Sequence, residues 1–332
     1  MEPNDLVPEY QQHDTLNLDI IESHHDALSS TETVTAQVAQ VITATMSPVM
    51  LVKLENPSAH VHAPNRAILK LYDRRFGSSL RRSKKGKHLP CRVQDEAAFC
   101  SFVDRGDMGP FISEIEEDRR TELLPNSAAD WRLEPEGQDK FEAALWWKAR
   151  LHFETEVEAY KRLKELQGVF VPRMYASVRL SSSSASGDMS KYFTVNGILL
   201  QFIPGCSLYD LPESPSSPTQ QEWASIVQRA VQGAHEINQR DILHKDSCPR
   251  NVVVDADSHQ PFIIDLAQCY FKDQLFKDWE HFGFGEGQED WTPEAQWCES
   301  LRCRDNPGSI GLPMQSKLKR VKGFSIDVKY LE

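Results

Sequence analysis

The sequence contains no apolar run of about 20 residues, the length that a helix needs to cross a bilayer, so we expect no membrane-spanning segment. Its first residues also lack the basic and apolar stretches of a secretory signal peptide. A formal net charge of −12 argues against general binding to nucleic acid, which requires a basic surface. We therefore expect a soluble protein with neither a membrane nor a nucleic acid as partner.

Cysteine is sparse and shows no pattern. The seven cysteines are odd in number, and no two of them form a Cys-x-x-Cys pair. Disulfide frameworks and structural zinc sites usually show such pairing. The sequence therefore favours reduced thiols and a cytoplasmic or nuclear location.

The N-terminal residues 1–46 lack Lys and Arg but contain eight Asp and Glu. Segments with this charge bias usually bury too little apolar surface to fold. Residues 1–46 are therefore predicted to form an acidic, flexible segment, in which 34–45 could form a short helix. The pattern changes near Pro48, where two strands are predicted at 49–54 and 67–72.

A basic segment follows at 74–87. It is interpreted either as a nuclear-localisation or phosphate-binding patch, or as a solvated loop. The spacing then predicts a long helix over 139–167, closed by Gly168. On that helix Glu156 shares a face with aromatic and apolar residues, so it needs a cationic partner, because an unpaired buried charge is costly.

The second half of the chain alternates loops with regular elements. Loop insertions are predicted at 181–187 and 212–218, on either side of a buried strand at 197–203. A helix is predicted to begin after Thr219, since Glu222 completes a capping box. This helix leads the chain to the most informative segment.

That segment runs from 242 to 265 and places Asp246, Asn251 and Asp265 beside short apolar strands. The order is His-x-Asp, then Asn five residues after the Asp, a strand, a turn, a second strand and Asp. Phosphoryl transfer requires a carboxylate that orients the attacking hydroxyl and oxygen ligands that hold Mg²⁺. Without a cation, clustered groups of this kind would repel one another and remain unsatisfied.

This order of motifs resembles the catalytic and metal-binding loops of the protein-kinase superfamily. Within it the chain is similar to divergent kinase-like proteins of fungi, since the segments KLYDRRF, FETEVEAYKRL and QGVFVP follow in their order. The resemblance implies an α+β, bilobal protein-kinase-like fold with a small, mostly antiparallel N-terminal lobe and a curtailed helical C-terminal lobe. It implies an N-terminal lobe over 47–203, with a long insertion at 74–138, and a C-terminal lobe over 204–332.

The resemblance also implies roles for five side chains. Asp246 would accept or orient the proton of the attacking hydroxyl. Asn251 and Asp265 would be Mg²⁺ ligands. Lys70 would hold the α- and β-phosphates of ATP, and Glu156 would pair with Lys70.

The residues themselves leave alternatives open at some of these positions. Because apolar residues flank Lys70, an exposed strand lysine is also compatible with the pattern. Glu154 and Glu158 are rivals of Glu156, although they point away from the apolar face. His244 is interpreted as structural support for the loop rather than as a base.

The sequence departs from the kinase pattern in several places. No Gly-x-Gly-x-x-Gly precedes Lys70, and the only candidate loops are 44–49 and 57–60. Cys248 stands where protein kinases have a lysine, and Leu-Ala follows Asp265 where they have Phe-Gly. Only 67 residues follow Asp265, and the glycines at 283–287 are interpreted as a flexible loop.

We therefore expect an ATP- and Mg²⁺-dependent phosphotransferase that acts on a hydroxyl acceptor, either protein Ser/Thr or a small molecule. The alternative is a catalytically silent pseudokinase that serves as a nucleotide-binding or scaffolding module. A third interpretation is an unrelated α+β protein with chance motifs, which five ordered residues argue against.

Overall fold

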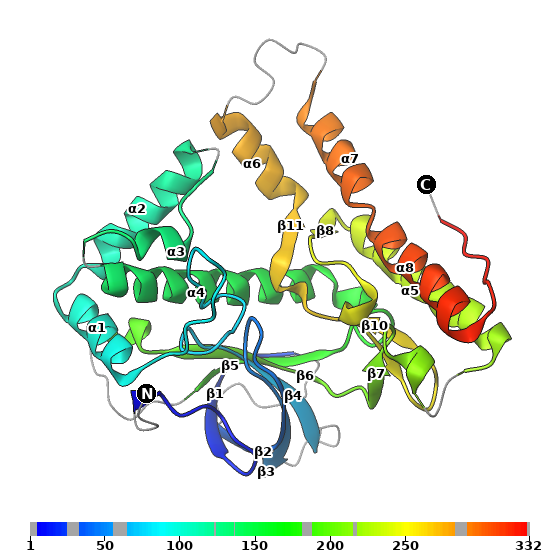
Figure 1. The fold of residues 1–332 in the computed structure, drawn as a ribbon, viewed down its shortest axis with the longest axis horizontal. Helices are drawn as coiled ribbons and strands as arrows, with labels where there is room; N and C mark the ends of the chain where they lie inside the picture. Colours follow the sequence, from blue (N-terminus) through cyan, green and yellow to red (C-terminus); the bar gives the residue numbers. More distant parts are fainter. Residues whose placement is uncertain are drawn as a thin grey trace. The chain divides into compact units, whose positions relative to one another are not determined.

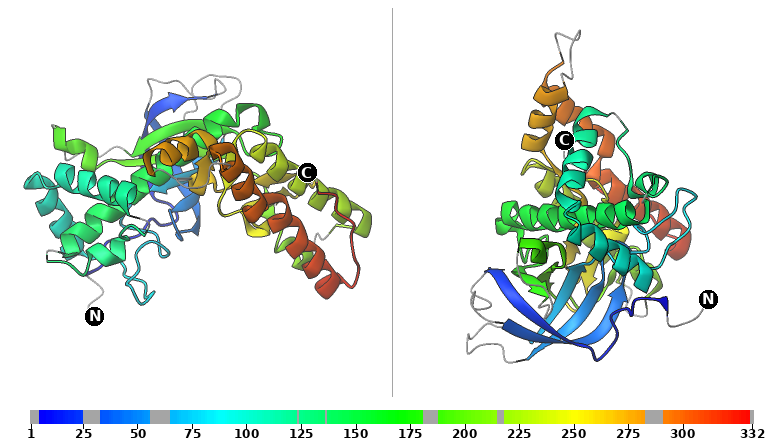
Figure 2. Two further views of the ribbon diagram at one scale, coloured as in Figure 1. Left: turned by 90° about the horizontal axis from the view of Figure 1, so that it is seen from above. Right: turned by 90° about the vertical axis from the view of Figure 1, so that its left-hand side faces the viewer.

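The structure is a computed structural model, and it comprises two compact units (Figures 1 and 2). The first consists of Met1–Phe153 and Met174–Gln201, and the second of Glu154–Arg173 and Phe202–Glu332. The residues that it describes are 5–24, 33–55, 65–122, 124–135, 137–180, 188–214, 218–282 and 291–330.

An antiparallel sheet forms much of the first unit. Its strands are β1 (Thr15–Ser23), β2 (Thr33–Thr43), β3 (Val49–Glu55), β4 (Arg66–Tyr72), β5 (Met174–Leu180) and β6 (Val195–Gln201). Their order is β1-β2-β3-β4-β6-β5, and the sheet closes because β1 also pairs with β5. The closed sheet surrounds a core of aliphatic side chains, among them Leu18, Val38 and Leu69.

The strands β1 and β2 overturn the prediction for residues 1–46. For the described residues 15–23 and 33–43 the expectation of a flexible segment, in which 34–45 could form a helix, is wrong, because both stretches are strands and Val34, Ala36 and Val38 are buried at every second position of β2. This period of two is that of a strand with one face on a core. The predicted strands at 49–54 and 67–72 are confirmed as β3 and β4.

The described residues of the predicted insertion at 74–138 contain three helices. They are α1 (Val93–Asp104), α2 (Met108–Thr121) and α3 (Ala128–Trp131), and α4 (Gly137–Arg162) begins directly afterwards. Phe111 lies between Phe102 and Trp131 in edge-to-face contacts, with centroids 5.7 Å and 5.1 Å apart. The aromatic cluster gives the first unit a second core.

Two arginines of the basic segment are buried against α4. Arg81 donates to Glu142 from Nη1 at 2.9 Å and from Nη2 at 2.7 Å, and Arg74 donates from Nη1 at 2.7 Å. Glu142 is fully buried, and Arg81 is 1% exposed. The solvated-loop interpretation is therefore wrong for Arg74 and Arg81, although it holds for the exposed Lys84, Lys85 and Lys87.

The long helix predicted over 139–167 is confirmed as α4, but its C-terminal end lies earlier than predicted. The α-helical part stops at Arg162, and the 3₁₀ turn η2 (Lys164–Leu166) carries the chain to Gly168. Gly168 has a φ of +78°, which is the left-handed conformation that a glycine readily adopts after a helix.

The second unit is mainly helical, with short strands between the helices. Its further helices are α5 (Gln220–Asn238), α6 (Lys272–Phe282), α7 (Pro293–Arg304) and α8 (Asn306–Lys322). Its strands are β7 (Gly205–Ser207), β8 (Ile242–His244), β9 (Val252–Asp255), β10 (Pro261–Ile263) and β11 (Cys269–Phe271). The 3₁₀ turns η4 (Leu211–Glu213), η5 (Pro249–Asn251) and η6 (Leu266–Gln268) lie between them, and in the first unit η3 covers Asp188–Tyr192.

Helix α5 begins where the capping box predicts. Thr219 N donates to Glu222 Oε2 at 2.7 Å, and Glu222 N donates to Thr219 Oγ1 at 3.4 Å. The apolar stripe of α5 is buried from Trp223 to Ile237, and α5 packs alongside α8. The fold is thus mixed α and β, with an antiparallel sheet in the N-terminal part and helices in the C-terminal part.

No helix within the described ranges combines the length and the apolar character that crossing a membrane requires. All seven cysteines lie in the described part of the chain and are free thiols.

Replacing Glu142 by Ala is expected to destabilise the first unit by about 3–5 kcal/mol, because two buried guanidinium groups lose their shared carboxylate. Urea unfolding followed by tryptophan fluorescence measures this change, since Trp131, Trp146 and Trp147 lie in the first unit. Glu117→Ala is the control, because Glu117 pairs with Arg120 at the exposed surface of α2 and should matter little. Equal losses in the free energy of unfolding for Glu142→Ala and Glu117→Ala would contradict a stabilising role of the buried ion pair.

Candidate functional site

The loop between β8 and β9 carries two of the predicted site residues. Asn251 Nδ2 donates to the backbone oxygen of Asp246 at 2.8 Å and to its Oδ2 at 2.9 Å. Asp246 is exposed and Asn251 is half-buried. The structure therefore brings Asp246 and Asn251 together, and the amide fixes the direction of an accessible carboxylate.

Asp265 lies just after β10, in a left-handed backbone conformation with φ 63° and ψ 59°. Such a conformation is uncommon for a residue other than glycine and is concentrated at functional sites. The backbone oxygen of Asp265 lies 3.0 Å from Nε2 of His244 and accepts a hydrogen bond from its Nε2–H tautomer. His244 is 2% exposed, so it links the Asp246 loop to Asp265, as the structural interpretation of this histidine requires.

Glu156 is the inward-facing carboxylate on α4. It is fully buried, whereas Glu154 is exposed and Glu158 pairs with Arg162 at 2.7 Å. Glu156 Oε1 accepts a hydrogen bond from Leu266 N at 3.2 Å. The helix is thereby joined to the residue that follows Asp265, within the second unit.

Lys70 lies on β4 of the first unit, between Val49 on β3 and Ile198 on β6. It is 6% exposed, and its Nζ lies 5.6 Å from the ring centroid of Tyr72. An exposed strand lysine, the alternative that the sequence left open, is therefore wrong. The salt bridge between Lys70 and Glu156, which belong to different units, stays a prediction.

Sequence reasoning missed Asn306, which anchors the loop between β8 and β9 from the start of α8. Its Oδ1 accepts from His244 N at 3.1 Å, and its Nδ2 donates to His244 O at 2.7 Å. Ser247 Oγ donates to the backbone oxygen of Asn306 at 3.0 Å. Asp305-Asn306-Pro307 signals only a helix start, and no local pattern points to a loop some sixty residues earlier.

Asn251 offers an oxygen of the kind that a hydrated divalent cation takes as a ligand. The described hydrogen bonds of the Asn251 side chain use Nδ2, which leaves Oδ1 as a ligand atom. The Tyr160 hydroxyl is buried and has no hydrogen-bond partner among the described residues. Burial first, and then the negative charges of Glu156 and Asp265, raise the pKa of Tyr160, so its hydroxyl remains a donor. An orphaned buried donor beside two carboxylates indicates a water or ligand.

A second acidic cluster, in the first unit, is better explained without a metal. Ligand atoms of Cys91, Asp95 and Glu142 lie within 4.8 Å of one another. Both oxygens of Glu142, however, accept hydrogen bonds from Arg81. Burial raises the pKa of the Cys91 thiol to about 12, and a protonated thiol is a poor ligand. The cluster therefore serves the buried ion pair.

No protein-family model and no curated protein matches the chain. Among solved structures, the kinase domain of PknI from Mycobacterium tuberculosis is similar, with 16% identity, a TM-score of 0.32 and 70% of this chain covered. A double mutant of that domain gives 15% identity and the same TM-score and coverage. The chain spans 58% and 60% of the two kinase domains. The structural neighbours are thus kinase domains at low identity.

Asn306→Ala is expected to loosen the loop between β8 and β9, because the buried backbone groups of His244 lose both partners at a cost of about 1–3 kcal/mol for each unsatisfied group. Hydrogen exchange at the His244 amide measures this, and exchange should accelerate. Ser247→Ala removes one hydrogen bond from the same anchor and should have a smaller effect. Unchanged exchange in Asn306→Ala would show that other contacts hold the loop.

Proposed function

We propose that the chain is an ATP- and Mg²⁺-dependent phosphotransferase of the protein-kinase-like fold, which transfers the γ-phosphoryl group to a hydroxyl acceptor. The carrying observation is one hydrogen-bonded chain of groups. Asn251 orients Asp246, and His244 ties the same loop to Asp265. These contacts support the proposal, because they connect the side chains of Asp246 and Asn251 and the backbone of Asp265 within the second unit.

Asp246 would receive the proton of the acceptor hydroxyl or orient that hydroxyl. Its carboxylate is exposed, so an acceptor can reach it, and the amide of Asn251 holds one of its oxygens. A positioned carboxylate of this kind contributes to catalysis as a general base.

Asn251 Oδ1 and the Asp265 carboxylate would hold Mg²⁺. When bound, the Mg²⁺–ATP complex supplies the transferable phosphoryl group and neutralises its developing charge. The left-handed backbone of Asp265 and the bond from His244 hold the start of the Asp265 turn in place. These contacts support Asp265 as a proposed ligand, because they fix the backbone from which its carboxylate extends.

Lys70 would hold the α- and β-phosphates of ATP, and Glu156 would pair with Lys70. Both side chains are almost completely buried. A buried charge is strongly destabilising without a partner of opposite sign, which supports the predicted pair. Glu156 is further held by Leu266 N.

A small-molecule acceptor is favoured over a protein. Cys248 precedes the η5 turn and occupies the position of a lysine that protein kinases use at the transferred phosphoryl group. Kinases of small molecules also lack that lysine. We also propose that the chain is related to the divergent kinase-like proteins of fungi.

A catalytically silent, nucleotide-binding or scaffolding module is the second candidate. Residues 44–48, which join β2 to β3, contain no glycine, so backbone amides are less able to approach phosphates closely. The other loop considered, 57–60, and the glycines at 283–287 lie outside the described residues.

Asp246→Asn is expected to lower the rate of Mg²⁺-dependent ATP turnover by about 10²–10⁴-fold, because the general base is lost while the hydrogen bond from Asn251 is kept in part. Turnover is measured as ADP release with a panel of hydroxyl acceptors. Asp257→Asn, an exposed aspartate in the turn between β9 and β10, is the control and should leave the rate unchanged. Equal rates for wild type and Asp246→Asn would refute the assignment.

Asp265→Ala is expected to abolish the thermal stabilisation of the chain by Mg²⁺-ADP, since a carboxylate ligand of the cation is removed. A shift that is present in wild type and lost in this variant, without any turnover, would favour the silent nucleotide-binding module. No shift in wild type would contradict the nucleotide site itself.

A further inference from the structure

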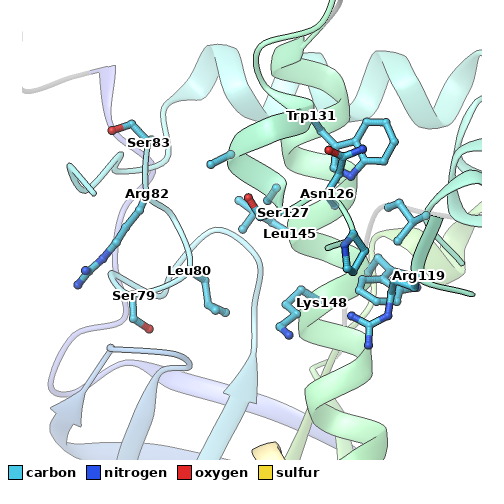
Figure 3. A pocket seen from close by; sticks show the side chains of 16 residues that line it. Ser79, Leu80, Arg82, Ser83, Arg119, Asn126, Ser127, Trp131, Leu145 and Lys148 are labelled. Atoms are coloured by element: carbon cyan, nitrogen blue, oxygen red, sulfur yellow. The ribbon is translucent and has the colours of Figure 1, made fainter. Parts of the chain in front are cut away.

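A pocket of about 400 Å³ opens within the first unit, away from every residue assigned a role above. It lies between the loop that carries Ser79 to Ser83 and the helices α2, α3 and α4 (Figure 3). Its volume is within the range of small-molecule sites. Residues 79–83 of the basic segment form one wall of the pocket. The proposed phosphoryl transfer assigns no role to these residues.

The charge of the lining is of one sign. Arg82, Arg119 and Lys148 line the pocket, and no Asp or Glu does. Figure 3 shows Arg82 and Arg119 on opposite sides of the pocket, with Lys148 between them and the guanidinium of Arg82 directed away from the other two. In a chain with a net charge of −12, a lining whose described charged side chains are all cationic favours an anionic ligand.

The two arginines have no carboxylate of their own. Within the described residues, Arg119 stacks over the ring of Trp147 at 5.1 Å and makes no ion pair. Arg82 donates from Nε to the Ser78 backbone oxygen at 3.0 Å and likewise makes no ion pair there. Their guanidinium groups therefore keep donors for a ligand.

Two carboxylates adjoin lining residues and are occupied by other groups. Asp130, between Ala129 and Trp131 in the sequence, pairs with Lys84 at 2.9 Å and accepts from Ser127 Oγ at 2.6 Å. Asp118 accepts from the backbone nitrogen of the lining residue Asn126 at 2.7 Å.

The remaining wall is apolar and partly aromatic. Leu80, Ile115, Leu145, Trp131 and Trp147 contribute it. Indole rings and aliphatic side chains offer a flat surface on which an apolar or aromatic body gains by burial. The pocket thus combines cationic hydrogen-bond donors with an apolar wall that can contact the hydrocarbon part of a ligand.

We propose that this pocket binds a small organic phosphate monoester whose carbon part is flat and apolar. Guanidinium groups match the oxygens of a phosphate in two-pronged hydrogen bonds, and several cations around one cavity suit its double charge. The apolar wall receives the carbon part. The proposal is independent of phosphoryl transfer, because binding at this pocket is measured without ATP.

Phenyl phosphate is the probe, with inorganic phosphate and phenol as its two halves, and calorimetric titration of the full chain gives the affinities. Phenyl phosphate should bind more tightly than either half. Arg119→Gln should weaken its binding about tenfold or more, as expected for the loss of a charged hydrogen-bonding partner, and the double variant Arg82→Gln/Arg119→Gln should weaken it further.

Arg120→Gln is the matched control. Arg120 is the next residue on α2, pairs with Glu117 and does not line the pocket, so binding should be unchanged. Raising the salt concentration should weaken the binding of phenyl phosphate and leave the binding of phenol unaffected. Melting temperatures of all variants confirm that they are folded.

Several results would overturn the proposal. Binding of phenol as tight as that of phenyl phosphate would make the pocket a site for apolar ligands. Binding of inorganic phosphate as tight as that of phenyl phosphate would show that the apolar wall does not contribute to binding. Equal losses in Arg119→Gln and Arg120→Gln would show a general charge effect, and no binding of phenyl phosphate by wild type would refute the site.

Discussion

The buried ion pair on Glu142 is the constraint on which the first unit depends. One carboxylate on α4 accepts hydrogen bonds from Arg74, two residues after the end of the strand β4, and from Arg81, in the middle of the basic segment. Two cations and one anion away from water are tolerable only if the hydrogen bonds are complete. The ion pair therefore sets the position of α4 against the end of β4. The same helix continues to Glu156.

The second unit depends on a different device, in which one histidine is held from two sides. Its backbone is bound by Asn306, and its ring reaches the backbone of Asp265. The loop with Asp246 and the turn with Asp265 are consequently fixed by the same residue. Precision at the proposed site thus comes from buried neutral hydrogen bonds, which are less costly to desolvate than charges.

Local patterns in the sequence were sufficient for several elements. The capping box at Thr219, the strands β3 and β4 and the inward face of Glu156 all follow from interactions within a few residues. The acidic composition of residues 1–46 argues against the strands β1 and β2, although β2 itself has no Asp or Glu and carries the period-two pattern of Val34, Ala36 and Val38. Asn306 and the Arg81–Glu142 pair join residues some sixty positions apart, and one sequence carries no signal of such pairing.

The left-handed backbone at Asp265 also limits how this chain can change in evolution. Glycine, asparagine, aspartate and histidine enter this conformation more readily than other residues, whereas β-branched residues are strongly disfavoured there. A lineage that lost the proposed metal ligand would therefore be expected to carry asparagine, glycine or histidine at this position. The identity of this one residue in related sequences becomes a record of whether the site was kept, weakened or abandoned, because the backbone permits so few other outcomes.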